Sequence, residues 1–152
     1  MEKKQTPRVV TKNDFEWVSL LKDGREITLQ LEQYEDEPED NYIAETITIT
    51  FIEDDEVLGS ENDFFQFTRN GYVTNIDNQN YLLQNIFLPP CLRGTGISQI
   101  AIEFFKEFTG GAGIFVQNPF AQKINDGSDL LEPGQKFVQR MQDKGLIMPF
   151  SI

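Results

Sequence analysis

The sequence has no histidine and a single cysteine, Cys91, among its 152 residues. Without histidine, Ser-His-Asp and Cys-His catalysis are excluded, and one thiol without any imidazole excludes the ordinary zinc sites. A single cysteine also excludes an internal disulfide, which favours a reducing compartment. We expect Cys91 to be a small buried residue rather than a nucleophile, because no base lies near it in the sequence.

Long apolar runs and basic residues are also scarce. No apolar run approaches the roughly 18 residues of a membrane span, and residues 1–5 lack the apolar core of a signal peptide. Lys and Arg number 13 against 25 Asp and Glu, which gives a net charge of −12. This balance argues against nucleic acid and anionic membranes as partners. We therefore expect a cytoplasmic protein whose acidity either confers solubility or attracts a cationic amine.

The first ninety residues read mainly as antiparallel β-structure within one domain, residues 1–152. Residues 1–13 are polar and are expected to be disordered at the start. Asp23-Gly24 predicts one hairpin turn and Arg69-Asn70-Gly71 another, while the acidic, proline-broken stretch 34–41 is expected to be a loop. Alternation of apolar and polar residues and β-branched content predict strands at 15–21, 26–33, 42–53, 64–68, 72–76 and 81–88.

The second half alternates strand and helix. Apolar residues from Ile97 to Phe108 recur at helical spacing, and Gly110-Gly111 supplies the usual C-terminal stop. A buried parallel strand is expected at 113–117, a loop at 125–134, a helix at 135–144 capped by Gly145, and an edge strand in the tail 146–152. The fold class predicted is α+β, with a mixed, mostly antiparallel sheet and few helices.

The most informative stretch lies between the strand at 81–88 and the helix that begins at Ile97. It reads Leu-Pro-Pro-Cys-Leu-Arg-Gly-Thr-Gly-Ile-Ser from Leu88 to Ser98. Two glycines stand where the first N–H groups of the helix lack partners and its dipole is positive. Glycine lets an anion approach the backbone closely, so this turn is suited to holding a phosphate. It can equally be a plain turn that needs glycine for its conformation.

This stretch resembles motif A of the GCN5-related N-acetyltransferase (GNAT) superfamily, in which a strand ends in V-x-P-x-x-R-G-x-G-I-S/A before a helix. The matching residues are Leu88, Pro90, Arg93, Gly94, Gly96, Ile97 and Ser98. Further on, Asn118 and Ala121 resemble the family's N-x-x-A, and Gly145 resembles its closing glycine. The similarity covers residues 81–148, less than half of the chain.

The resemblance implies a GNAT-like sheet and a site for acetyl-coenzyme A, whose pyrophosphate the turn would bind. It assigns coenzyme binding to Leu88, Arg93, Gly94, Thr95, Gly96, Ile97, Ser98 and Asn118. The activity implied is transfer of an acetyl group from acetyl-coenzyme A to an amine, without a metal. The alternatives are a catalytically silent GNAT-like domain that binds an acyl-coenzyme A or a protein partner, and an α+β domain with no coenzyme site.

The sequence also departs from the family pattern. Cys91 stands where the family has Gln or Arg, and Met141 stands where it has the tyrosine that often protonates the departing thiolate. The two helices expected after the first strand are not found in the pattern. Gln84 can orient a water molecule but cannot take its proton. The acidic candidates for a general base are Glu45, Glu53 and Asp77.

Overall fold

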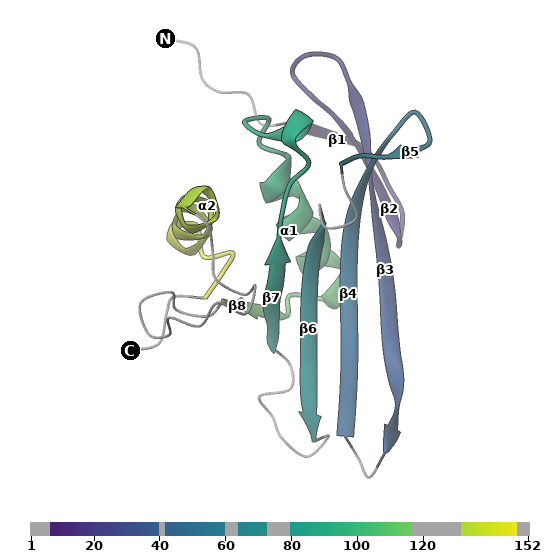
Figure 1. Cartoon of the computed structure of the whole chain (residues 1–152), viewed down its shortest axis with the longest axis vertical. Helices are drawn as coiled ribbons and strands as arrows, with labels where there is room; N and C mark the ends of the chain where they lie inside the picture. Colours follow the sequence, from purple (N-terminus) through teal and green to yellow (C-terminus); the bar gives the residue numbers. More distant parts are fainter. Residues whose placement is uncertain (1–6, 40–41, 60–63, 73–79, 117–131, 149–152) are drawn as a thin grey trace.

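The computed structural model describes residues 7–39, 42–59, 64–72, 80–116 and 132–148. These residues form one sheet with two α-helices, as Figure 1 shows. Along the sheet the strand order is β1-β2-β3-β4-β6-β7-β8, and β5 pairs with β4 beside this path. The strands are β1 (Arg8–Lys12), β2 (Glu16–Leu20), β3 (Glu26–Glu39), β4 (Tyr42–Glu53), β5 (Glu56–Val57), β6 (Phe65–Tyr72), β7 (Asn80–Ile86) and β8 (Gly113–Phe115).

The sheet is antiparallel throughout except where β7 meets β8. These two strands pair in parallel from Asn80 opposite Gly113 to Leu82 opposite Phe115. The chain passes from β7 to β8 through helix α1 (Ile97–Thr109), which ends at Gly110 in the left-handed conformation. The predicted mostly antiparallel sheet, with residues 81–88 and 113–117 as parallel neighbours, is therefore confirmed over the described residues. No α-helix precedes α1 in the parts of the chain that the structure describes.

The core lies between one face of the sheet and the two helices. Strand residues project to alternate faces, and the buried apolar positions of β3, β4 and β6 are Ile27, Leu29, Leu31, Ile47, Ile49, Phe51, Phe65 and Phe67. Phe105 of α1 stacks on Phe67 with ring centroids 3.9 Å apart, and Phe104 stacks on Trp17 at 4.7 Å. Helix α2 (Glu132–Asp143) places Phe137 against Phe65, so both helices cover the same face.

The acidic stretch 34–41 was predicted to be a loop, but its described part, up to residue 39, is strand. β3 continues to Glu39 and pairs with β4 along Tyr34, Glu35 and Asp36. The register shifts between Asp36 and Glu39, and such an irregularity tolerates a proline that cannot donate to a ladder. The long partner strand β4 thus overrides the local preference for a turn.

Three further expectations were wrong in part. Arg69-Asn70-Gly71 is not a hairpin turn, because β6 runs through it to Tyr72 while paired with β4. Residues 8–12 form the edge strand β1 rather than a disordered start. The last helix begins at Glu132, earlier than predicted, and Gly145 follows it with φ 74° as expected.

Other predicted elements lie partly or wholly outside the described residues. The expected strand at 72–76 lies mostly outside the described residues, as do Gln117, most of the loop 125–134 and the end of the tail. Of that tail, Leu146–Met148 is not a strand, although the Met148 N–H donates to the Ile114 carbonyl of β8 at 2.8 Å.

We predict that Phe105→Ala lowers the free energy of unfolding by about 3–5 kcal/mol, because it removes a fully buried ring and leaves a cavity. Urea unfolding measures this change. The matched control is Phe115→Ala on β8, whose side chain is 40% exposed and whose loss should cost under about 1 kcal/mol. Equal losses for the two variants would show that the stacking of α1 on β6 is not a main source of stability.

Candidate functional site

The glycine turn, residues 89–96, joins β7 to α1 and is attached to the core on both sides of its glycines. Leu92 before them and Ile97 after them are both fully buried. Pro90–Leu92 forms a single turn of 3-10 helix, for which the fixed φ of Pro90 is suited. The position of the turn therefore follows from the packing of the sheet and α1.

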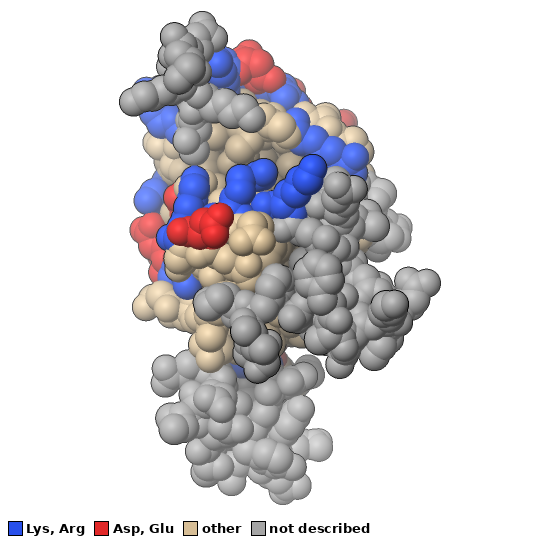
Figure 2. Space-filling view, turned by 90° about the vertical axis from the view of Figure 1, so that its left-hand side faces the viewer, with Lys and Arg blue, Asp and Glu red and all other residues tan. Residues whose placement is uncertain are grey.

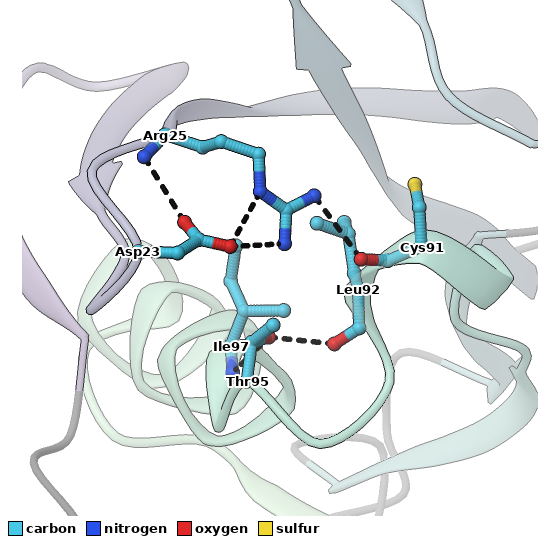
Figure 3. A network of polar contacts seen from close by, with 6 residues as sticks. All are labelled: Asp23, Arg25, Cys91, Leu92, Thr95 and Ile97. Carbon is cyan, nitrogen blue, oxygen red and sulfur yellow. Dashed lines mark hydrogen bonds and ion pairs between the residues drawn. The ribbon is translucent and has the colours of Figure 1, made fainter.

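The carbonyl groups in the first half of the glycine turn accept hydrogen bonds from the protein. The Pro89 and Pro90 carbonyls accept from the N–H groups of Leu92 (2.9 Å) and Arg93 (3.3 Å). The Leu92 carbonyl accepts from the Thr95 hydroxyl at 2.6 Å and from the Thr95 N–H at 3.3 Å. Figure 3 shows that the Thr95 side chain points back to Leu92, so this hydroxyl shapes the turn.

Several backbone N–H groups at and just after the two glycines have no acceptor among the described residues. Gly94 and Gly96 have φ of 77° and 84°, a left-handed conformation that costs other residues about 1–2 kcal/mol. No side chain caps α1, although the Ile97 N–H lies 3.4 Å from the Thr95 hydroxyl oxygen. Among the described residues, the N–H groups of Gly94, Gly96 and Ser98 meet no acceptor. Such donors at the positive end of a helix can bind an anion.

Strand β7 is irregular just before the turn. Phe67 pairs with Leu83 and Gln66 with Asn85, so Gln84 is an extra residue without a partner on β6. On its other edge, β7 pairs with β8 only as far as Leu82, and no described strand continues this pairing. Bulges occur often beside active sites, where they end pairing or redirect a group. The edge of β7 beyond Leu82 is thus left without a described partner strand, a few residues before the glycine turn.

The residues predicted to bind a coenzyme differ in what they can offer. Arg93 is exposed, and Leu88 and Ser98 are half-buried. Ile97 is fully buried, so only its backbone is available, and Thr95 is engaged as described. Asn118 lies outside the described residues. The expectation that Cys91 is buried is wrong, because its side chain is exposed on the 3-10 turn.

Two contacts with the glycine turn were missed by sequence reasoning. Pro7 is buried against Gly96, where an added Cβ would lie 3.0 Å from the Pro7 Cδ. Arg25 reaches the turn from the β2–β3 hairpin and donates to the Cys91 carbonyl at 3.1 Å, as Figure 3 shows. The Asp23-Gly24 signal located the hairpin, but no local pattern indicates what its tip contacts.

A buried polar network lies on the core side of the sheet, away from the turn. The Glu45 carboxylate forms an ion pair with Arg69 and accepts hydrogen bonds from Gln33 Nε2 at 2.9 Å and the Tyr81 hydroxyl at 2.6 Å. Burial, followed by the bond to Glu45, raises the pKa of Tyr81. Leu88 follows Tyr81 by seven positions of strand and linker, a span of up to roughly 23 Å.

None of the described acidic candidates has the features of a general base for this site. Glu45 is 4% exposed, and its carboxylate oxygens are engaged by Arg69, Gln33 and Tyr81. Glu53 lies opposite Glu56 in the β4–β5 turn, and Asp77 is outside the described residues. Met141, in the position of the family's tyrosine, is 2% exposed and belongs to the core.

A band of positive charge lies on one face of this acidic protein (Figure 2). Figure 2 shows the side on which α2 lies, with Lys and Arg forming a band across it. Lys136 and Arg140 of α2 and Lys144 after it are exposed and recur at intervals of four, on one helix face. Lys144 donates to Gln99 of α1 at 2.7 Å. The net charge of −12 is therefore a poor guide to the field near α1 and α2.

In the described part of the chain, no three His, Cys, Asp or Glu side chains are grouped so as to hold a metal ion. No helix there is long and apolar enough to span a membrane. No protein-family model matches the chain, and neither a curated protein nor a solved structure is significantly similar to it.

We predict that Tyr81→Phe reduces the loss of stability at alkaline pH. A raised pKa means that the folded state favours the neutral phenol. The neutral Tyr81 phenol therefore contributes its full share of stability below about pH 10, the pKa of tyrosine in the unfolded chain. This share is lost as the pH rises through the pKa of Tyr81 in the folded state. Urea unfolding should show the variant less stable near neutral pH, by about 1.5–3 kcal/mol for a bond to a charged acceptor, with a shallower alkaline decline.

Tyr34→Phe is the matched control for this measurement. Tyr34 is 62% exposed and donates to Glu32 at 2.7 Å, so its removal should change the alkaline decline little. An unchanged decline in Tyr81→Phe would show that ionisation of Tyr81 does not limit alkaline stability.

Proposed function

We propose that this protein is an N-acetyltransferase that transfers an acetyl group from acetyl-coenzyme A to an amine. The observation that supports it is the unit β7–glycine turn–α1–β8. In this unit a bulged strand and a left-handed Gly-x-Gly turn place unpartnered N–H groups at the start of a helix. The resemblance of residues 81–148 to the GNAT superfamily assigns this unit to the coenzyme.

Each part of the unit has a defined task under this proposal. The N–H groups of Gly94, Gly96 and Ser98 bind the pyrophosphate, because backbone donors and the helix dipole both favour an anion. The exposed guanidinium of Arg93 adds positive charge locally. The end of β7, beyond its pairing with β8, supplies backbone donors for the thioester carbonyl. Such work by the backbone does not depend on side-chain identity.

In the reaction, the neutral amine forms a bond to the acetyl carbon, the carbon–sulfur bond breaks, and the amine loses a proton while the thiolate gains one. Met141 cannot donate that proton because it carries no acidic hydrogen and is buried. A thiolate with a pKa near that of free cysteine, about 8.5, is a tolerable leaving group near neutral pH. The missing acid should therefore slow the reaction by about 10²-fold or more without abolishing it.

The second candidate function is a GNAT-like domain that binds an acyl-coenzyme A, or a protein partner, without turnover. Two observations favour it: Met141 is buried in place of the expected acid, and Glu45 is committed to Arg69. The two candidates share the glycine turn and differ in whether an acid and a base reach the reacting atoms.

The experiment that separates these functions combines calorimetric titration with acetyl-coenzyme A and a thiol-release assay with a broad panel of amines. We expect binding and slow release of free thiol with a suitable amine. Tight binding without release would favour the non-catalytic binder. Absence of binding would contradict a coenzyme site and leave the glycines as a turn only.

Met141→Tyr provides a second readout in the same assay. A gain in rate requires Met141 to face the thiol, and its burial in the core opposes this. We therefore expect no gain, together with a loss of about 1–3 kcal/mol of stability from overpacking. A faster thiol release in Met141→Tyr would show that this position does reach the leaving group.

A substitution at Gly94 tests the phosphate cradle. A Cβ at Gly94 would meet no atom within 4 Å, so Gly94→Val should cost little beyond the backbone penalty of about 1–2 kcal/mol. We expect it to abolish binding of acetyl-coenzyme A, measured by calorimetry, because the side chain occupies the space that the pyrophosphate needs.

Gly145→Val is the matched control, since Gly145 has a similar φ of 74° and also meets no atom within 4 Å of an added Cβ. It should lose comparable stability and keep full affinity. Unchanged affinity in Gly94→Val would show that the turn is not the phosphate cradle.

A further inference from the structure

The tip of the β2–β3 hairpin is held by its own hydrogen bonds. The Leu21 N–H donates to the Arg25 carbonyl at 2.8 Å, and the Gly24 N–H donates to the Leu21 carbonyl at 3.0 Å. Asp23 accepts from the Arg25 N–H at 3.1 Å and from the Arg25 Nε at 2.8 Å, and its carboxylate lies 2.7 Å from Nη2. The Arg25 side chain is therefore fixed by two contacts with one carboxylate.

The remaining arm of this guanidinium extends to the glycine turn. Arg25 Nη1 donates to the Cys91 carbonyl at 3.1 Å, across 66 positions of the chain. Figure 3 shows Asp23 and Arg25 on one side of the turn, with Arg25 pointing to the peptide after Cys91. A rigid hairpin tip is thus connected to the segment that leads into Gly94 and Gly96.

The contacted peptide is well placed to control the donors of the turn. A peptide group is planar, so fixing the Cys91 carbonyl also fixes the direction of the Leu92 N–H, which donates to Pro89. The next carbonyl, of Leu92, accepts both bonds from Thr95. These carbonyls are thus engaged by groups of the protein, while the Gly94 and Gly96 N–H groups meet no acceptor among the described residues. Preorganised donors bind more tightly because less ordering is needed on binding.

We propose that Arg25, oriented by Asp23, is a positioning residue that holds the glycine turn in its phosphate-binding conformation. This inference rests on the proposed coenzyme function. Arg25 acts through the Cys91 carbonyl and touches no ligand in this role. Arginine is required because one planar group must contact the carboxylate with two nitrogens and the carbonyl with a third. A lysine ammonium keeps the charge but lacks this fork geometry.

The test compares Arg25→Gln with Lys22→Gln, and acetyl-coenzyme A with S-acetylpantetheine. Lys22 is an exposed cation of the same hairpin, so both variants remove one positive charge. We expect Arg25→Gln to weaken binding of acetyl-coenzyme A by about 10-fold, the value of one lost hydrogen bond. Binding of S-acetylpantetheine, which lacks the pyrophosphate, should not change. Lys22→Gln should affect neither ligand.

Two further measurements separate positioning from general stability. In the assay with amines, Arg25→Gln should raise KM for acetyl-coenzyme A and leave kcat unchanged, and Arg25→Lys should restore less than half of the lost affinity. In the free protein, amide hydrogen exchange of residues 92–98 should be faster in Arg25→Gln than in Lys22→Gln. Their urea midpoints should be equal, because an exposed ion pair contributes about 0–1 kcal/mol.

The inference is overturned if Arg25→Gln binds acetyl-coenzyme A as the wild type does, if both ligands lose affinity equally, or if exchange at 92–98 is unchanged. Equal weakening by Lys22→Gln would also overturn it, since the effect would then come from net charge. Failure of the proposed function looks different, because the wild-type protein itself would bind neither ligand.

Discussion

The structure depends on the packing of the apolar face of α1 against the sheet. Phe104 and Phe105 lie on Trp17 and Phe67, which belong to strands at different positions in the sheet order. Aromatic rings at these distances bury large areas and favour particular orientations. Since the helix is fixed in this way, its first residue, its N–H groups and the glycine turn before it have one place relative to β7. The candidate site is therefore a consequence of core packing.

The local distribution of charge in this protein differs from what its net charge suggests. The buried Glu45 carboxylate pairs with the half-buried Arg69 and accepts hydrogen bonds from Tyr81 and Gln33. Burying a charge costs desolvation, which such bonds offset. Near α1 and α2, exposed cations recur in a protein of net charge −12. An anionic coenzyme is compatible with this surface, and an acidic net charge alone does not argue against it, because exposed charges are screened beyond about 8–10 Å.

Much of the fold could be predicted where the pattern is strong and the partner is near. The alternation at Ile47, Ile49 and Phe51 located β4, and the helical spacing from Ile97 located α1 and its glycine stop. Errors arose where pairing with a neighbouring strand of the sheet outweighed local preference: the strand at Tyr34–Asp36 and the continuation of β6 through Gly71 both follow from pairing with β4. Of the candidate site, the turn at Gly94 and Gly96 was predictable, because the two glycines lie between a strand pattern and a helical pattern.

The sequence by itself determined most of the order of strands and helices, the exclusion of histidine chemistry, and the glycine turn between a strand and a helix. These features depend on residue type and on neighbours within a few positions. Only the tertiary structure decided that Arg25 contacts the turn, that Pro7 lies on Gly96, and that Glu45 and Met141 are buried. The physical reason is that these contacts join residues far apart in the chain, whose approach is set by sheet order and packing and leaves no local periodicity to read.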